Sequence, residues 1–163
     1  MPELIDISIK NQVLEYRGKS GEVLACYPIS SGLNGVGEQE GSYQTPRGLH
    51  KIRAKIGAGL PENAILVARR FTGELYTPEL HKLYPGKDWI LTRILWLSGC
   101  EIGKNRLGSC DTMRRYIYLH GTPDSTPLGG EPASKGCIRM RNRDIIELFD
   151  AVPVYTPVVI RED

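Results

Sequence analysis

A cysteine and a histidine stand near each other in the last third of this chain. His120 ends an alternating apolar run, and Cys137 closes the sequence SKGC at positions 134–137. A thiol attacks a carbonyl carbon well only as the thiolate, and enzymes usually form the thiolate with an adjacent imidazole that later protonates the leaving group. A long loop rich in Gly, Pro and Ser separates the two residues, so they must meet through folding. We take Cys137 as the candidate nucleophile and His120 as its candidate base.

The glycine before the cysteine has a physical use. Because Gly136 lacks a Cβ, the backbone can turn there until successive N–H groups converge on one point. We predict an oxyanion hole built from the N–H groups of Lys135, Gly136 and Cys137. Ser134 can brace the turn through its hydroxyl, and the charge of Lys135 would favour the thiolate.

Each of these residues also has an ordinary structural explanation. A lone cysteine is more often a small buried hydrophobic residue than a nucleophile. We apply that explanation to the remaining cysteines and histidines, which are Cys26, Cys100, Cys110, His50 and His81. A zinc site made from Cys100, Cys110, His120 and Cys137 would lack the short paired spacings of such sites. The fragment GVG at positions 35–37 lacks the third glycine and the helix of a dinucleotide site. We therefore expect no metal and no cofactor.

The totals are those of an ordinary small globular protein. The chain has 163 residues and a mass of 18.2 kDa, which is about the size of one domain, spanning 1–163. The 18 Gly and 11 Pro favour many turns and a strand-rich fold. A formal charge of +2 is too small to indicate nucleic-acid binding. Basic residues cluster after Lys135, which suits either an anionic small substrate or a solvated face.

The N-terminal sequence gives an expectation about location. It has no basic segment followed by an apolar core, so no secretory signal is visible. No run approaches the roughly 18 apolar residues that cross a bilayer, so we expect no membrane partner. Dispersed cysteines suit reduced thiols. These features together predict a cytoplasmic protein.

Alternation of apolar and polar residues predicts short strands along much of the chain. The first three strands should form a meander, because tight turns separate them. Between Lys55 and Gly86 the pattern does not settle the structure, and Ala64–Arg70 fits either a strand or a helical turn. The expected strands are Leu4–Ile9, Val13–Arg17, Glu22–Ser31, Leu49–Ala54, Asp88–Ser98 and Tyr116–His120.

A helix and a closing strand are expected after the SKGC turn. Asn142 is a good N-cap residue for the helix. Three apolar residues then share one helix face at spacing i, i+3, i+4, namely Ile145, Leu148 and Phe149. Pro153 should end the helix, and Val154–Ile160 should form a strand at a sheet edge because Pro157 has no N–H donor.

Two sequence motifs resemble a known family. The HG at positions 120–121, followed by SKGCIRM at 134–140, resembles the YkuD-type L,D-transpeptidase signature, HG…(S/T)HGC with a hydrophobic residue and often Arg after it. The TPRG at 45–48 is similar to the family's TPxG segment. The resemblance covers the whole chain. It implies a mainly β fold, a YkuD-like β-sandwich or open barrel with one short helix after the catalytic Cys turn.

The resemblance also implies roles for individual residues. Cys137 would attack an L,D peptide bond in a peptidoglycan stem and form a thioester. His120 would be the base, oriented by the backbone carbonyl of Gly121. Arg139 matches the arginine after the motif cysteine, and its planar fork suits a substrate carboxylate.

One position departs from the family pattern. Lys135 stands where the usual motif has a histidine, so a neutral ring has become a mobile cation. That charge could hold the terminal carboxylate of a short free peptide, and we group Lys135 and the neighbouring Ser134 with Arg139 as substrate-binding candidates.

The acceptor that resolves the thioester decides the function. Without an export signal the enzyme would meet only soluble wall fragments, and leaderless relatives with the SKGC form resemble cytoplasmic L,D-carboxypeptidases. We therefore expect a cysteine L,D-carboxypeptidase that removes the terminal D-Ala from murein tetrapeptide fragments in peptidoglycan recycling. Its partner would be a murein peptide or muropeptide. The alternatives are an L,D-transpeptidase and a non-catalytic domain that binds peptidoglycan fragments.

Overall fold

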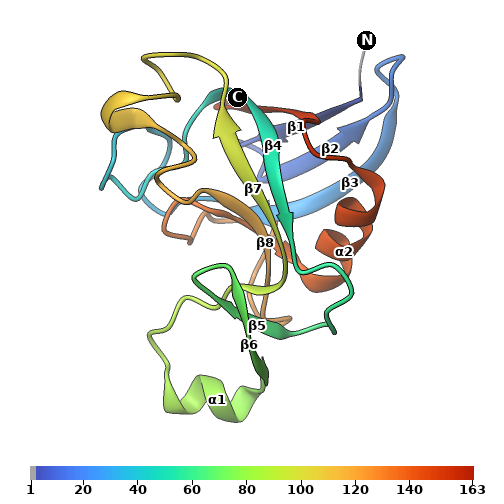
Figure 1. The fold of residues 1–163 in the computed structure, drawn as a ribbon, viewed down its shortest axis with the longest axis vertical. Helices are drawn as coiled ribbons and strands as arrows, with labels where there is room; N and C mark the ends of the chain where they lie inside the picture. Colours follow the sequence, from blue (N-terminus) through green and yellow to red (C-terminus); the bar gives the residue numbers. More distant parts are fainter. Residues whose placement is uncertain (1–2) are drawn as a thin grey trace.

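The computed structural model describes residues 3–163 and is mainly β. Its strands form one hydrogen-bonded sheet in the order β4-β10-β1-β2-β3-β9-β8-β7-β5-β6, and an added β4–β7 pairing closes the strands from β4 to β7 into a ring (Figure 1). The elements are β1 (Leu4–Ser8), β2 (Val13–Arg17), β3 (Val23–Ser30), β4 (Gly48–Ile56), β5 (Ala64–Val67), β6 (Arg70–Leu75), α1 (Pro78–Leu83), β7 (Leu91–Gly99), η1 (Gly108–Cys110), β8 (Tyr118–Thr122), β9 (Ile138–Arg141), α2 (Asn142–Ala151) and β10 (Pro157–Arg161). The expected mainly β fold, with a short helix after the cysteine turn, is confirmed; β9 lies between that turn and α2.

The closing strand does not lie at an edge. β10 runs parallel to β1 and antiparallel to β4, with one of these strands on each side of it. Pro157 is tolerated because it is the first residue of the strand, where a missing N–H costs little. The predicted edge position is therefore wrong.

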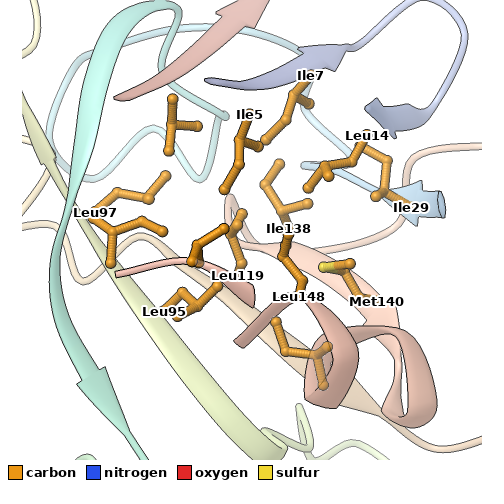
Figure 2. Close-up of a cluster of buried hydrophobic side chains, with 14 of the residues drawn as sticks. Ile5, Ile7, Leu14, Ile29, Leu95, Leu97, Leu119, Ile138, Met140 and Leu148 are labelled. Carbon is orange, nitrogen blue, oxygen red and sulfur yellow. The ribbon is translucent and has the colours of Figure 1, made fainter. Parts of the chain in front are cut away.

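One apolar core holds the ring together. Side chains from several strands and from α2 meet in it, including Ile5, Leu14, Leu97, Leu119 and Leu148 (Figure 2). The predicted apolar face of α2 is confirmed, because Ile145, Leu148 and Phe149 are all buried. This rigid core fixes β8 and β9 side by side, with the candidate residues on them.

The predicted helix cap is wrong. Arg141 occupies the N-cap position, without a side-chain capping bond, and Asn142 is the first helical residue. The Asn142 side chain is completely buried and turns inward instead of back over the helix end.

Residues 57–90 form an appended segment that extends from one end of the ring (Figure 1). In it, β5 pairs with β6, and Ile65 faces Leu91 of β7. The segment also bonds to β7 through the N–H of Asn63, which donates to the Thr92 hydroxyl. The run from Ala64 is thus a strand, and the six-residue helix α1 was not predicted. Among residues 3–163, no helix has the length and apolar character needed to cross a membrane.

Candidate active site

Neighbouring strands place the candidate nucleophile and base on one face. β8 and β9 are parallel, and His120 lies beside Arg139 in their register. Because side chains alternate between the two faces of a sheet, Cys137 shares its face with Arg139, two residues later, and with His120. The residues between them, Leu119 and Ile138, face the core. Folding therefore brings together the two residues that the sequence singled out.

His120 is held as a neutral imidazole with one unused nitrogen. Its side chain is 0% exposed, and burial lowers its pKa. Nδ1 lies 2.6 Å from the carbonyl oxygen of Gly121, which can only accept, so Nδ1 carries the proton. Nε2 is buried and has no hydrogen-bond partner among residues 3–163. A neutral ring with a bare Nε2 is the form that a general base requires.

Cys137 is a protonated thiol in this environment. The N–H of Tyr118 donates to Sγ at 3.3 Å, and Sγ donates to the carbonyl of Tyr116 at 3.3 Å. Burial raises the pKa of Cys137 to about 12, against the opposing effects of the Tyr118 N–H, Arg139 and Arg115. The thiol therefore needs a base before it can attack.

The leading positive charges that act on the sulfur come from two arginines. These are Arg139 and Arg115, which lower the pKa of Cys137, whereas the side chain of Lys135 is exposed. That Lys135 also favours the thiolate stays a prediction.

An ion pair flanks both reactive residues. Asp88 accepts a hydrogen bond from Arg139 Nη2 at 2.8 Å, and Arg139 Nε is buried without a partner among residues 3–163. Asp88 raises the pKa of both His120 and Cys137, whereas Arg139 lowers both. The arginine expected to bind substrate is thus also tied to Asp88. The sequence did not single out Asp88, which was expected as the first residue of the strand Asp88–Ser98; the strand begins instead at Leu91, and Asp88 lies before it.

The turn that carries Cys137 is braced from within. Ser134 Oγ accepts from the N–H of Gly136 at 3.1 Å and donates to the carbonyl of Cys137 at 2.5 Å. This confirms the bracing role expected of Ser134. It also commits the Gly136 N–H to the turn, which leaves the N–H groups of Lys135 and Cys137 as the better candidates for an oxyanion hole. The oxyanion hole itself stays a prediction.

A second segment holds the same turn from outside. Thr45, in the TPRG sequence, donates its hydroxyl to the carbonyl of Gly136 at 2.9 Å. Gly136 has φ +118°, and a Cβ there would lie 3.1 Å from the carbonyl oxygen of Gln44. Arg115 donates to that same oxygen at 2.6 Å. Glycine is therefore required here both for its conformation and for the close approach of the Gln44 backbone.

The sequence matches a family model described as YkuD, L,D-transpeptidase catalytic domain, over residues 2–160. This chain belongs to that family. It is an enzyme of a cysteine-dependent group, and the resemblance noted from its motifs is confirmed.

Individual relatives match over shorter stretches. The Bacillus subtilis (strain 168) protein YkuD, named as an L,D-transpeptidase, is 45% identical over 47 residues, which is 29% of this chain and 28% of that protein. YqjB of the same strain is 41% identical over 49 residues, 30% of this chain and 27% of that protein. The matched segments thus cover less than a third of these relatives.

Solved structures show the same fold. An L,D-transpeptidase from Mycobacterium smegmatis superposes with a TM-score of 0.58 at 19% identity, covering 98% of this chain and 58% of that one. The C442S mutant of an Enterococcus faecium L,D-transpeptidase gives 0.59 at 19% identity, covering 99% and 50%. This chain therefore spans about half the length of those proteins.

Two grooves of this YkuD-family domain meet at Lys135. One has a volume of about 270 Å³ and is lined in part by Tyr43, Arg114 and Tyr116. The other, of about 400 Å³, includes Tyr43, Ser134 and Lys135 in its wall. The residue that departs from the family motif therefore lines both grooves.

Among the remaining cysteines and histidines only His50 is buried as its structural explanation requires, whereas Cys26 and His81 are exposed and Cys100 and Cys110 are half-buried. His50 is fully buried between the carbonyl of Gly48 and the hydroxyl of Thr112, and His81 accepts from the indole N–H of Trp89. All the cysteines are free thiols, namely Cys26, Cys100, Cys110 and Cys137. Residues 3–163 contain no group of three or more His, Cys, Asp or Glu that could hold a metal ion.

Proposed function

We propose that this enzyme is a cysteine L,D-carboxypeptidase that removes the terminal D-Ala from murein tetrapeptide fragments. The proposal includes a murein peptide or muropeptide as partner, a cytoplasmic place of action in peptidoglycan recycling, and one catalytic domain over residues 1–163. Met1 and Pro2 lie outside the described residues.

The chemistry follows from the unused nitrogen of His120. Nε2 takes the proton from Cys137, and the thiolate adds to the carbonyl carbon that precedes D-Ala. The N–H groups of Lys135 and Cys137 would hold the oxyanion. The imidazolium then protonates the departing amine, which releases D-Ala and leaves a thioester on Sγ. Water, deprotonated by the same Nε2, hydrolyses the thioester and restores the thiol.

The observation that carries the choice of a carboxypeptidase is the exposed ammonium of Lys135 at the junction of the two grooves. Arg114 lines one of these grooves and is also exposed. Cations beside the nucleophile turn suit the free carboxylate of a terminal D-Ala, a group that an internal peptide bond lacks.

A second candidate is L,D-transpeptidation, in which an amine replaces water. It is favoured by the names and titles of the relatives, which are L,D-transpeptidases. Both reactions share the thioester, so the acceptor alone separates them.

The deciding experiment incubates a purified disaccharide-tetrapeptide with the protein, with and without D-Met, and identifies products by mass spectrometry. Loss of alanine alone supports the carboxypeptidase, whereas efficient exchange to the D-Met product supports the transpeptidase and contradicts our proposal. In Lys135→His we expect more exchange and poorer cleavage, and an unchanged product ratio would remove Lys135 from the specificity. The control Cys137→Ala should be inactive. If the unchanged protein binds the fragments without turning them over, the domain only binds.

A further inference from the structure

Asn142 joins three segments through one buried side chain. It is 0% exposed, and its Oδ1 accepts from the hydroxyl of Thr92 at 2.7 Å. Its Nδ2 donates to Asn63 Oδ1 at 2.9 Å and to Asp124 Oδ1 at 3.4 Å. Such a fully bonded polar group inside a protein specifies one local arrangement. This arrangement lies against Gly121 in β8, the strand that carries His120.

Thr92 lies in an irregular part of β7 that faces the candidate base. Leu91 pairs with Gly121 and Ile94 pairs with His120, so the register slips by the two residues in between. Thr92 is fully buried with φ +73°, a conformation that a β-branched residue rarely adopts. Thr92 adopts this conformation within the register slip. Its hydroxyl donates to Asn142 and accepts from the N–H of Asn63 at 3.0 Å.

The Gly121 peptide is enclosed by these groups. A Cβ on Gly121 would lie 2.3 Å from Asn142 Oδ1 and 2.6 Å from the carbonyl oxygen of Leu91. The carbonyl of Gly121 accepts from His120 Nδ1 at 2.6 Å. Asn142 and the Leu91 backbone therefore pack closely against the Gly121 Cα, which restricts movement of the peptide that carries this carbonyl. The carbonyl in turn selects the protonated nitrogen of His120.

We propose that Asn142 and Thr92 are positioning residues for His120. They hold the Gly121 carbonyl where it fixes the Nδ1–H tautomer, so that Nε2 stays bare for the proton of Cys137. Neither residue touches the reacting atoms. The inference rests on the proposed function only in assigning His120 as the base.

The test combines ¹⁵N–¹H NMR of the histidine side chains with kcat and KM on the tetrapeptide. Thr92→Val removes the hydroxyl and keeps the branched shape, and we expect a detectable Nε2–H form of His120. We also expect kcat to fall roughly 10- to 100-fold, with KM within about threefold of the wild-type value. Thr92→Ser restores the hydroxyl and should recover most of kcat. Asn142→Ala should repeat the Thr92→Val result if it folds.

Thr112→Val is the matched control. It removes an equally buried threonine hydroxyl that bonds to His50 instead. We expect the His120 tautomer and kcat to stay unchanged in it. An unaltered His120 tautomer in Thr92→Val overturns the inference, as does an equal loss of kcat in Thr92→Val and Thr92→Ser. If the tautomer shifts in Thr92→Val but wild type leaves the tetrapeptide intact, the positioning role is supported and the proposed function fails.

Discussion

His50 and His120 are two buried histidines with one decisive difference. Both are 0% exposed, both have a pKa lowered by burial, and both place Nδ1 on a backbone carbonyl oxygen, at 3.1 and 2.6 Å. In His50, Nε2 accepts from the Thr112 hydroxyl at 3.0 Å, whereas Nε2 of His120 has no partner among residues 3–163. Leaving a buried polar atom unpaired costs about 1 to 3 kcal/mol. The unpaired Nε2, on the sheet face that His120 shares with Cys137, distinguishes the candidate base from the structural ring, because burial and tautomer are the same in both.

The largest expected effect comes from replacing each ring by glutamine. His120→Gln should lower kcat on the tetrapeptide by about 10² to 10⁴, because general base catalysis is lost. His50→Gln should keep kcat within about threefold at a temperature where it is folded, because no step uses His50. Steady-state assays with far-UV circular dichroism check both. Equal losses of kcat in the two variants would break the comparison.

The thiol provides the next effect. Since burial raises the pKa of Cys137 to about 12, alkylation of Cys137 by iodoacetamide should accelerate about tenfold per pH unit between pH 7 and pH 10. Peptide mass mapping measures the rate at this cysteine. A rate that is already constant at pH 7 would mean a preformed thiolate and a charged His120, contrary to the neutral pair described above.

Acid should destabilise the fold through the buried rings. The pKa of His50 is lowered from 6.5 to about 4, so the unfolded chain binds more protons between these values and stability rises with pH. His50 alone should remove about 3 kcal/mol from the free energy of unfolding as the pH falls from 6.5 to 4. Urea denaturation of wild type and His50→Gln at both pH values isolates this effect. Parallel pH dependence in the two proteins would refute it.

The smallest effect concerns the partner of His50. Thr112→Val leaves Nε2 of His50 without a donor, and we expect a loss of about 1 to 3 kcal/mol in the free energy of unfolding at pH 7. Denaturant titration measures this loss. A fully stable Thr112→Val would indicate that the hydroxyl does not satisfy the ring, which removes the contrast with His120.

Local patterns predicted much of the fold. The alternating runs gave β1, β2 and β3 close to their observed bounds, and the spacing of Ile145, Leu148 and Phe149 gave the buried face of α2. Ring closure through β4 and β7 could not be predicted, because long-range pairing leaves no local periodicity. β10 was expected at an edge because Pro157 has no N–H, and local sequence did not show that this residue begins a strand with partners on both sides.

The candidate site was predictable in its residue types but not in its environment. The HG and SKGC motifs pointed to His120 and Cys137. Nothing in the sequence places Asp88 on Arg139, a contact between the segment before β7 and strand β9. Asn142 was predicted to cap the helix because asparagine is common at that position. Only the three-dimensional structure shows that its side-chain amide instead accepts a hydrogen bond from the Thr92 hydroxyl.

The most direct test of the central claim is the rate at which Cys137 is acylated. Wild type, His50→Gln and His120→Gln are mixed with excess tetrapeptide, quenched in acid within seconds to minutes, and weighed by intact-protein mass spectrometry. We predict a thioester adduct on Cys137 in wild type and His50→Gln at similar rates, and none in His120→Gln over the same times. Formation of the adduct in His120→Gln at the wild-type rate would contradict the assignment of its bare Nε2 as the base.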